Sequence, residues 1–384
     1  MSLATRLTEF LVRHDVTAAV SVAVFRDGRI HTFESPSPLD KRPVTQHTRF
    51  QAASISKPVT AMAVLKLVDQ GLLDLDVDVR TYLKDAAWTL PFTNGVDPSS
   101  VAITLRHLLS HTAGTTVHGF CGYGIGAPPI STIDILNNVK FDVTVFDDGA
   151  VVVDRAPGTY RYSGGGYTVV QLVLESVLHT PFEDIMEQLL LQPLGMTDSS
   201  FHIDSSKGDH LAYAAPSNPN ETFMVEENLL KGLGGEYCVY PQGAAAGLWT
   251  TATDLAKLNI AILTSLNGSP GAFWSRKSAA LLLQSVSVHG PGSDDNGSIG
   301  LGWFLSDDKL GDLSVLTHTG GNVGFRSSSV TFTKRNAGFV VLQSSSFKYN
   351  FDSDDDQAVA VRRAIGREFD AILKDACANL DALP

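Results

Sequence analysis

The stretch QAASISKPVTAM, residues 51–62, places a serine three residues before a lysine at the start of an apolar segment. Pro58 follows Lys57 directly, and proline is tolerated in the first turn of a helix. The residues after Pro58 are apolar on almost every side, which predicts a buried helix over 57–71. Ser54 and Lys57 would then lie one helical turn apart on the same face.

A lysine in this position would be partly desolvated, and desolvation lowers the pKa of an amine. A neutral or proton-sharing amine beside a hydroxyl can activate a serine as a nucleophile. The helix N-terminus would add a positive field where an oxyanion forms. An N-cap serine followed by a solvated lysine fits the same residues. The stretch alone therefore leaves both interpretations open.

The Ser-x-x-Lys spacing is weak evidence by itself, because it occurs three times in the chain: at Ser54/Lys57, Ser306/Lys309 and Ser345/Lys348. The second pair falls in the polar turn SDDK, and the third follows a predicted strand. Only Ser54 opens a predicted helix. The context therefore selects Ser54 as the candidate nucleophile.

Two later stretches add candidate residues for the same site. PGTYRYSGGGYTVVQLVLESV (157–177) places Tyr162-Ser163-Gly164 in a glycine-rich turn before an apolar helix. LTHTGGNVGFRSSSV (316–330) places His318-Thr319-Gly320-Gly321 at the end of a predicted strand. Small residues there would let a substrate lie against the strand edge, where backbone N–H groups can donate to it.

Predicted strands gather at the two ends of the chain, and predicted helices fill the middle. The first end has a helix over 3–14 and strands over 18–25 and 29–34; the last has strands over 299–305, 313–318, 327–333 and 338–344 and a helix over 356–380. The helices between them are predicted over 57–71, 103–110, 131–137, 167–178, 182–192, 252–265 and 277–285. This order predicts an α+β fold, with an antiparallel sheet built from both termini, flanked by helices, and an inserted, mainly helical lobe.

We expect a single catalytic domain with two lobes. An α/β lobe would comprise about residues 1–56 and 297–384, and a helical lobe about residues 57–296. The cleft between the sheet and the helical lobe is the expected site.

The composition excludes several classes of partner. Among the 384 residues, 29 Lys and Arg stand against 41 Asp and Glu, for a net charge of −12 without any basic run. Nucleic-acid binding needs clustered basic residues, and an acidic surface disfavours anionic membranes. The N-terminal segment is not typical of a secretory signal, and the apolar run after it is too short to span a bilayer. We therefore expect a cytoplasmic protein without a nucleic-acid or membrane partner; its oligomeric state is not predicted.

Three motifs in this order resemble those of a known superfamily of serine hydrolases. Ser54-Ile55-Ser56-Lys57, Tyr162-Ser163-Gly164 and His318-Thr319-Gly320 are similar to the motifs of the β-lactamase-like superfamily, which includes class C β-lactamases, D-alanyl peptidases and family VIII-type esterases. The resemblance covers about residues 18–345. It includes the phrases LRHLLSHTAG (105–114), LLQPLGMTDSSF (190–201) and AAAGLWTTATDLAKL (244–258).

The resemblance implies a role for each motif residue. Ser54 would attack a carbonyl and form an acyl-enzyme, and Lys57 would lower the cost of removing its proton. Tyr162 would relay the proton to the leaving group, and the phenolate is one form it could take. The backbone N–H groups of Ser54 and Gly321 would form an oxyanion hole. His318, where many members have lysine, would contact substrate or support an ionised Tyr162, and would make activity sensitive to pH near neutrality.

Two departures from the superfamily pattern bear on the substrate. Gly164 stands where β-lactamases and transpeptidases usually have asparagine, and His318 removes a permanent positive charge. Both departures favour a small ester or thioester, and hence an esterase or acyltransferase. A peptidase, amidase or β-lactamase of the same fold remains an alternative, as does a non-catalytic binding protein.

Further candidates lie near the third motif and in the glycine-rich loop HGFCGYGIGAPP (118–129). Gly320, Gly321 and Asn322 are candidate substrate contacts on the strand, and Phe120 and Tyr123 are candidates in the loop. The motifs call for neither a metal nor an organic cofactor.

Other combinations of residues are less convincing. His111, His118 and Cys121 could approach a metal, but no fourth ligand has suitable spacing. Ser110 and His111 are adjacent at a predicted helix end and would not face each other, so a capping role for the serine is favoured. Cys121, Cys238 and Cys377 do not indicate a disulfide framework.

Overall fold

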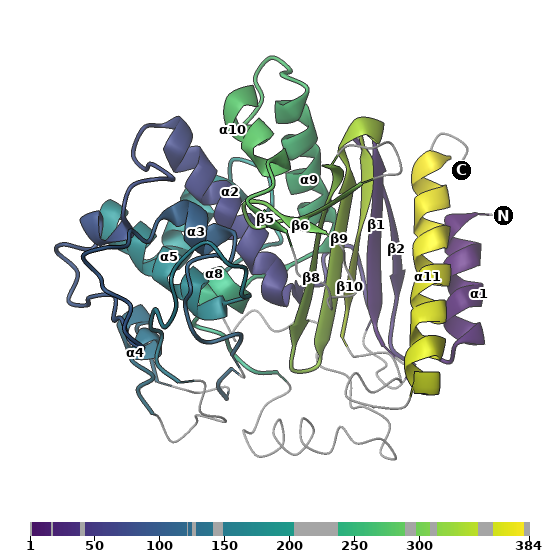
Figure 1. Ribbon diagram of the computed structural model, residues 1–384. Coiled ribbons are helices and arrows are strands. Elements are labelled where there is room, and N and C mark those ends of the chain that lie inside the picture. The colour runs from purple at the N-terminus through teal and green to yellow at the C-terminus, as the bar shows by residue number, and fades with distance from the viewer. Residues whose placement is uncertain are drawn as a thin grey trace.

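The computed structural model describes residues 2–16, 18–38, 43–120, 122–124, 128–140, 149–202, 237–288, 297–307, 313–344 and 356–379. Within these ranges the centre of the molecule is an antiparallel eight-stranded sheet in the order β2-β1-β10-β9-β8-β7-β6-β5 (Figure 1). Its strands are β1 (Val20–Arg26), β2 (Arg29–Ser35), β5 (Ser287–Val288), β6 (Ser298–Ile299), β7 (Phe304–Asp307), β8 (Leu313–Asn322), β9 (Phe325–Phe332) and β10 (Ala337–Gln343). Two short strands, β3 (Phe50–Gln51) and β4 (Trp249–Thr250), pair separately.

The two ends of the chain meet in this sheet, one strand in from its β2 edge. Strand β1 pairs antiparallel with β10 over seven residues, from Val20↔Gln343 to Arg26↔Ala337. The burial of both strands explains the pairing, since β1 is buried from Val20 to Phe25 and β10 along its whole length. The predicted sheet built from both termini is confirmed.

Two helices, α1 (Leu3–Arg13) and α11 (Asp356–Ala378), cover one face of the sheet and lie side by side at the right of Figure 1. Leu7 and Phe10 of α1 are fully buried against this face. Phe10 meets Phe369 of α11 with ring centroids 4.9 Å apart. The apolar stripe predicted in the first helix therefore packs against the last one.

The other face of the sheet carries α9 (Ala252–Leu266) and, beyond it, the inserted helical segment (Figure 1). Its helices are α2 (Ser56–Asp69), α3 (Leu105–Leu109), α4 (Thr132–Leu136), α5 (Gly164–Leu178), α6 (Phe182–Met186), α8 (Gly243–Ala246) and α10 (Arg276–Ala280). Short 3-10 turns occur at Ala53–Ile55, Val79–Thr81, Leu281–Leu283 and Thr333–Arg335, and a π turn continues α6 over Glu187–Leu191.

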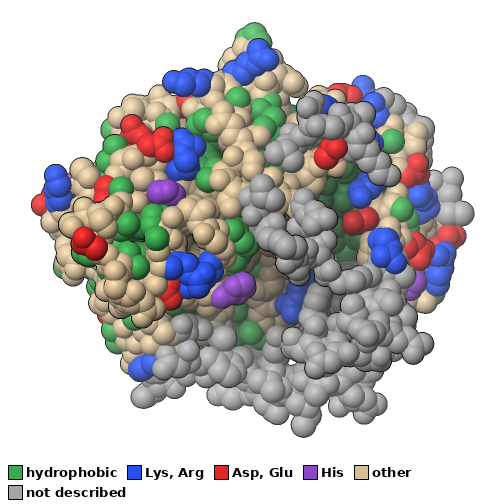
Figure 2. Space-filling view, viewed as in Figure 1, with side chains coloured by type: hydrophobic (Ala, Val, Ile, Leu, Met, Phe, Trp, Pro, Cys, Tyr) green, Lys and Arg blue, Asp and Glu red, His purple; other side chains and the backbone are tan. Residues whose placement is uncertain are grey.

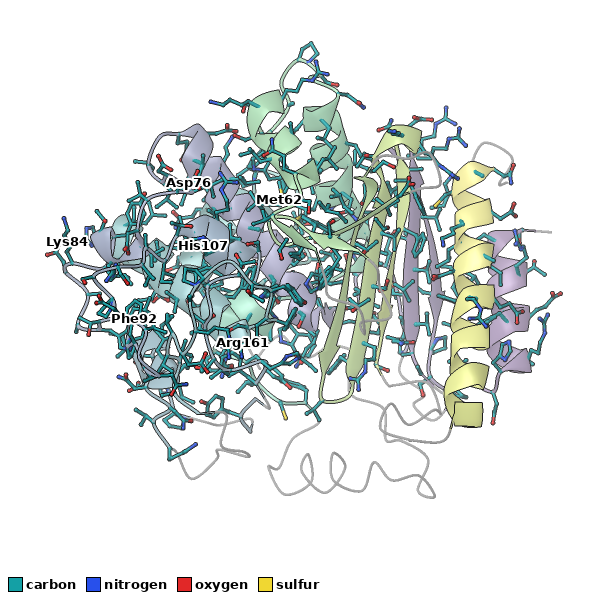
Figure 3. All side chains as sticks on the ribbon, viewed as in Figure 1. Met62, Asp76, Lys84, Phe92, His107 and Arg161 are labelled. Atoms are coloured by element: carbon teal, nitrogen blue, oxygen red, sulfur yellow. The ribbon has the colours of Figure 1, made fainter. Side chains whose placement is uncertain are left out.

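Helix α2 is the central element of the inserted segment. Every residue from Ser56 to Leu65 is buried, as its uniformly apolar sequence predicts. Met62, labelled in Figure 3, lies in the middle of the helix, and its carbonyl accepts a hydrogen bond of 3.0 Å from Trp274 Nε1. Because α2 is enclosed on all sides, the polar residues of its first turn are also removed from solvent.

Three predicted boundaries differ from the structure. The predicted strand 299–305 is two strands, because the chain turns at Gly302, where φ is +79° and a Cβ would lie 2.8 Å from Ala61 Cβ of α2. The predicted strand 313–318 continues to Asn322. Helix α5 begins at Gly164 because the Ser163 side chain caps it by accepting a 2.9 Å hydrogen bond from the Gly166 N–H. Helix α8 was missed, since four residues give too little periodicity.

The surface carries charges of both signs. Figure 2 shows acidic and basic side chains interspersed over the described part of this face, without a large area of one sign. Among the described helices, none combines the length and the apolar character that a bilayer-crossing helix requires.

Candidate active site

Ser54 lies in the tight turn that links β3 to α2. The residue before it, Ala53, has a φ of +50°, a left-handed conformation that costs a side-chain-bearing residue on the order of 1–3 kcal/mol. Two serine hydroxyls hold this turn: Ser56 Oγ donates to the Ala53 carbonyl at 2.6 Å, and Ser327 Oγ donates to the Ala52 carbonyl at 2.7 Å. The strained turn is thus fixed from both α2 and β9, which gives Ser54 a defined position.

Lys57 lies directly beside this serine. Its Nζ donates to Ser54 Oγ at 3.0 Å and to the carbonyl of Ala245, in α8, at 2.8 Å. The residue is 2% exposed, and burial lowers the pKa of the amine to about 7. The interpretation as a solvated lysine is therefore wrong. An appreciable fraction of the amine is neutral at neutral pH, so that it can accept a proton.

Tyr162 packs over the same amine, with Lys57 Nζ 4.9 Å from the centroid of its ring. Burial raises the pKa of the phenol, and its hydrogen bond with Ser54 offsets only part of that effect. Tyr162 is consequently a neutral phenol at ordinary pH. The phenolate form, considered above, is not supported by this environment.

The loop before α5 positions Tyr162. The ring stacks on His111 with centroids 4.2 Å apart, and His111 Nδ1 accepts a 3.1 Å hydrogen bond from the Ser163 N–H. Arg161, labelled in Figure 3, donates to both carboxylate oxygens of Asp154, at 2.5 and 3.1 Å, and to the Gly114 carbonyl at 2.6 Å. These bonds fix the backbone on both sides of the tyrosine.

His318, on β8, is 2% exposed and faces the same space. Its Nδ1 lies 2.7 Å from the Thr319 carbonyl oxygen. Burial, followed by the charge of Lys57, lowers the pKa of the imidazole to about 3. The expectation that His318 titrates near neutrality and supports an ionised tyrosine is therefore wrong, because a neutral ring carries no charge to do so.

These residues line one cavity of about 380 Å³. It brings together all four predicted catalytic residues, which are Ser54, Lys57, Tyr162 and His318. Its wall also includes four of the predicted substrate contacts: Phe120, Gly320, Gly321 and Asn322. Residues from four distant parts of the sequence thus meet around one serine hydroxyl.

One side of the cavity is the end of β8. The last residue pair between β7 and β8 is Phe304↔Thr317, whereas β8 continues to Asn322 with β9 on its other side. In the described structure, residues 318–322 therefore have a strand neighbour on one side only. Gly320 is required here because a Cβ would lie 2.3 Å from the Ala52 carbonyl oxygen and 2.9 Å from the Ser54 nitrogen.

Two predicted substrate contacts are placed differently from expectation. Asn322 lines the cavity, but its amide nitrogen donates to Gln51 Oε1 at 2.7 Å and to the Ala246 carbonyl at 3.1 Å. Tyr123 is not part of the cavity wall and lies in the hydrophobic core, 8% exposed. Its backbone pairs with Val239 through hydrogen bonds of 2.9 and 2.8 Å, which holds it away from the serine.

Sequence reasoning missed His118 as part of the cavity wall. The imidazole of His118 lies 4.9 Å from the Tyr162 ring, centroid to centroid, and partial burial followed by the charge of Lys57 lowers its pKa. A Cβ on Gly164 would lie 3.2 Å from the His118 carbonyl oxygen and 3.2 Å from Phe120 Cε2. The segment 118–120 thus fills the space of a larger side chain at 164. The glycine run at 164–166 was the available signal for this close approach.

The other parts of the wall were also unpredicted. Phe304, Tyr160, Ala245 and Ala246 line the cavity, the last two from the short helix α8.

The competing combinations of residues are resolved as follows. Ser110 Oγ donates to the Arg106 carbonyl at 2.7 Å, which confirms its capping role. Cys121 lies outside the described residues. Within the described residues, no group of three His, Cys, Asp or Glu side chains is arranged to hold a metal ion.

An antiparallel sheet covered by helices, with a Ser-x-x-Lys pair at the start of α2 whose lysine is buried, defines a serine hydrolase of the β-lactamase fold. The chain matches the Beta-lactamase family over residues 6–364 and belongs to that family.

The names of similar proteins include both esterases and penicillin-binding proteins. The chain is 28% identical to the esterase EstB of Burkholderia gladioli over 70% of this chain and 71% of that protein. It is 24% identical to a putative penicillin-binding protein, PbpX, of Bacillus subtilis over 76% of this chain and 63% of that one. The chain therefore spans between three fifths and three quarters of the length of these two relatives.

Solved structures show the same fold. EstCE1, described as a hydrolase with promiscuous acyltransferase activity, superposes with a TM-score of 0.65 at 25% identity, covering 90% of this chain and 94% of that one. A β-lactamase/D-alanine carboxypeptidase from Yersinia pestis superposes with a TM-score of 0.66 at 18% identity, covering 96% and 98%.

Proposed function

We propose that this protein hydrolyses or transfers the acyl group of small esters or thioesters through an acyl-enzyme on Ser54. The observation that carries this proposal is the 3.0 Å contact between Ser54 Oγ and the Nζ of a buried Lys57. A nucleophile within hydrogen-bond reach of a base is the arrangement that covalent catalysis needs. The pKa of about 7 lets the amine act as that base at neutral pH.

The proposed reaction begins when the neutral amine of Lys57 takes the Ser54 proton as Oγ attacks the carbonyl carbon. The N–H groups of Ser54 and Gly321 stabilise the oxyanion, a term worth about 3–4 kcal/mol for one donor. Tyr162, a neutral phenol that is hydrogen-bonded to Ser54, relays the proton to the leaving oxygen. Water or an alcohol then attacks the acyl-enzyme, and the same groups act in reverse.

The character of the cavity supports a neutral ester as substrate. Among the described residues that line it, Lys57 is the only Lys or Arg, and His318 is a neutral imidazole. Within the described part of the wall, a substrate carboxylate would find no permanent cation except the proposed base. The rings of Phe120, Tyr160 and Phe304 give the cavity aromatic walls suited to an acyl or alcohol group.

A β-lactamase, peptidase or amidase is the second candidate. The Ser–Lys pair serves equally well for acylation by an amide, and PbpX is among the proteins similar to this chain. Gly164 and the surrounding segment 118–120 leave no side-chain amide at that position to bind a peptide or lactam, which favours the ester. A non-catalytic binding protein would not need a serine held by a desolvated lysine.

The cellular location and partners of the protein, and its division into two lobes, are also proposals. We place the protein in the cytoplasm, acting on a small-molecule acyl substrate without nucleic acid or cofactor. We also propose the division into an α/β lobe and a helical lobe. The position of the cavity, between β8 of the sheet and helices α2 and α8, supports this division.

The test is the intact-protein mass after mixing with p-nitrophenyl butyrate and, separately, with a penicillin. We expect a butyryl adduct or fast p-nitrophenol release with the wild type, and neither with Ser54→Ala. The matched control is Ser110→Ala, which removes the serine of the competing Ser110-His111 pair and should still be acylated. A penicilloyl adduct alone would favour the second candidate. An adduct that persists in Ser54→Ala would refute the proposed nucleophile.

A further inference from the structure

His318, which lines the candidate active site, has a buried ring nitrogen without a hydrogen-bond partner in the described structure. Its Nδ1 lies 2.7 Å from the Thr319 carbonyl oxygen, which can only accept a hydrogen bond, so Nδ1 carries the ring proton. In the neutral ring, Nε2 is then a hydrogen-bond acceptor. This atom is buried and has no hydrogen-bond partner in the described structure, although the residue lines the cavity.

The position of the ring indicates which part of a substrate this atom faces. The His318 ring lies 6.4 Å from the Tyr162 ring and 5.2 Å from the Phe304 ring, centroid to centroid. In the proposed function, Tyr162 relays a proton between Ser54 and the oxygen of the leaving or entering alcohol. His318 lines the cavity next to that relay, on the side where the alcohol would enter and leave.

We propose that Nε2 of His318 accepts a hydrogen bond from a second hydroxyl group on the alcohol, so that the preferred acyl acceptors and leaving groups are diols or polyols. This inference rests on the proposed acyl-enzyme and names its alcohol class. A simple alcohol, or an ether of the same length, would leave the buried acceptor unpaired or force a water to remain. Sites built around a hydrogen bond discriminate strongly against analogues that lack the matching group.

The transfer step needs no additional reactant. The first hydroxyl oxygen of the diol bonds to the carbonyl carbon of the acyl group on Ser54. Its proton passes to Tyr162, and the phenol proton of Tyr162 passes to the neutral amine of Lys57. The bond between that carbon and Ser54 Oγ then breaks, and Oγ recovers the proton from Lys57. The second hydroxyl stays intact and donates to His318 Nε2 throughout.

The experiment measures how one acyl-enzyme divides between acceptors. Wild type is acylated with p-nitrophenyl butyrate in the presence of ethylene glycol or 1,3-propanediol, or of their mono-methyl ethers at equal concentration. The ratio of butyrate ester to free butyrate is then measured. Because all acceptors compete for the same acyl-enzyme, the ratio is independent of the acylation rate. Per hydroxyl, we expect at least one diol to exceed its mono-methyl ether by about five- to tenfold.

Three variants assign the preference to His318. His318→Phe keeps an aromatic ring without the acceptor and should bring the diol and ether ratios within twofold of each other. His318→Gln restores an acceptor and should recover part of the preference. His118→Phe, which removes the other imidazole of the cavity, is the matched control and should retain it. Melting temperatures of all three show whether each variant is folded.

The outcomes separate the inference from the proposed function. Failure to form any acyl-enzyme on Ser54 overturns both. An acyl-enzyme that treats diols and ethers alike overturns the inference alone, as does a diol preference that His318→Phe leaves unchanged. The comparison of diols with ethers needs only the wild type, so it tests the inference even if a variant fails to fold.

Discussion

Lys57 Nζ lies 4.9 Å from the centroid of the Tyr162 ring, and burial moves the pKa values of these two neighbours in opposite directions. The pKa of the Lys57 amine falls to about 7, whereas the pKa of the Tyr162 phenol rises above its usual value of 10.0. Burial disfavours the charged form of each group, which is the acid form of lysine and the base form of tyrosine. The two residues therefore have different roles: Lys57 is the base, and Tyr162 is a neutral phenol that relays a proton.

The first prediction concerns the pH dependence of acylation. Only the neutral amine can take the Ser54 proton, so the acylation rate should rise with pH through a midpoint near 7, the pKa of Lys57. Stopped-flow release of p-nitrophenol from p-nitrophenyl butyrate, between about pH 5.5 and 9, measures this profile.

Tyr162→Phe is the control for this assignment. It should slow acylation but leave the midpoint near 7, because the tyrosine does not titrate in this range. A midpoint near 10, or one that disappears in Tyr162→Phe, would show that the tyrosine is the base.

The second prediction concerns stability and compares wild type with Lys57→Met. The pKa of Lys57 is about 7 in the folded chain, against 10.5 for a free side chain. Below about pH 7 both states are protonated, and the buried charge costs the folded state its full penalty. Between about pH 7 and 10.5 only the unfolded state binds the proton, so wild-type stability rises with pH.

Lys57→Met has no amine at this position and therefore lacks this pH-dependent contribution to stability. The unfolding free energy of wild type should therefore gain about 2–3 kcal/mol relative to the variant between about pH 7 and 9, at ~1.4 kcal/mol per pH unit. Urea titrations of both proteins at the two pH values measure the difference. Parallel pH dependence in the two proteins would mean that Lys57 keeps an ordinary pKa.

The third prediction uses two adjacent glycines of β8. A Cβ at Gly320 would lie 2.3 Å from the Ala52 carbonyl oxygen, which is backbone and cannot move without shifting Ser54. The nearest atoms to a Cβ at Gly321 would belong to the Arg326 side chain, at 3.3 Å or more. Gly320→Ala should lower the unfolding free energy by about 2–4 kcal/mol, and Gly321→Ala by less than about 0.5 kcal/mol.

Chemical denaturation of the two alanine variants measures these values. Equal stability of the two would contradict the close packing of β8 against the turn that holds Ser54. Both substitutions remove the backbone conformational freedom of a glycine. A difference in stability between the two variants therefore reports the steric effect alone.

The fourth prediction concerns the support of Tyr162 by Arg161. Arg161 and Asp154 are each 22% exposed in their side chains and make two hydrogen bonds to each other. Arg161→Met would leave the Asp154 carboxylate and the Gly114 carbonyl without this partner. It should lower stability by about 1–3 kcal/mol and should reduce kcat for p-nitrophenyl butyrate more than it changes KM, because Tyr162 is displaced.

Arg155→Met is the matched control. Arg155 approaches the same carboxylate at 3.7 Å and is 48% exposed, so its loss should change stability by less than about 0.5 kcal/mol. Thermal unfolding and steady-state kinetics of the two variants test the comparison. A kcat equal to wild type in Arg161→Met would show that this ion pair does not position the tyrosine.

Local sequence patterns predicted the elements whose signal is strong and short-range. The uniform apolar character after Pro58 indicated that α2 is buried, and alternation and turn residues indicated the strands of both termini. The predicted helix that follows Ser54 selected it among three similar spacings, and the structure brings its partners into one cavity. The break in the strand at Gly302 was not predictable, because it depends on packing against Ala61 of a distant helix.

By itself the sequence determined the family, the sheet shared by the two termini and the residue types that gather around Ser54. The family follows from the resemblance of three motifs to a known superfamily, and the sheet and the residue types follow from spacing and hydrophobic pattern, which are properties of neighbouring residues. Only the tertiary structure decided the protonation state of Lys57, Tyr162 and His318, the place of Tyr123 in the core, and the segment 118–120 beside Gly164. The physical reason is that a pKa or a steric contact depends on burial and on neighbours such as the Ala245 carbonyl, 188 residues away along the chain.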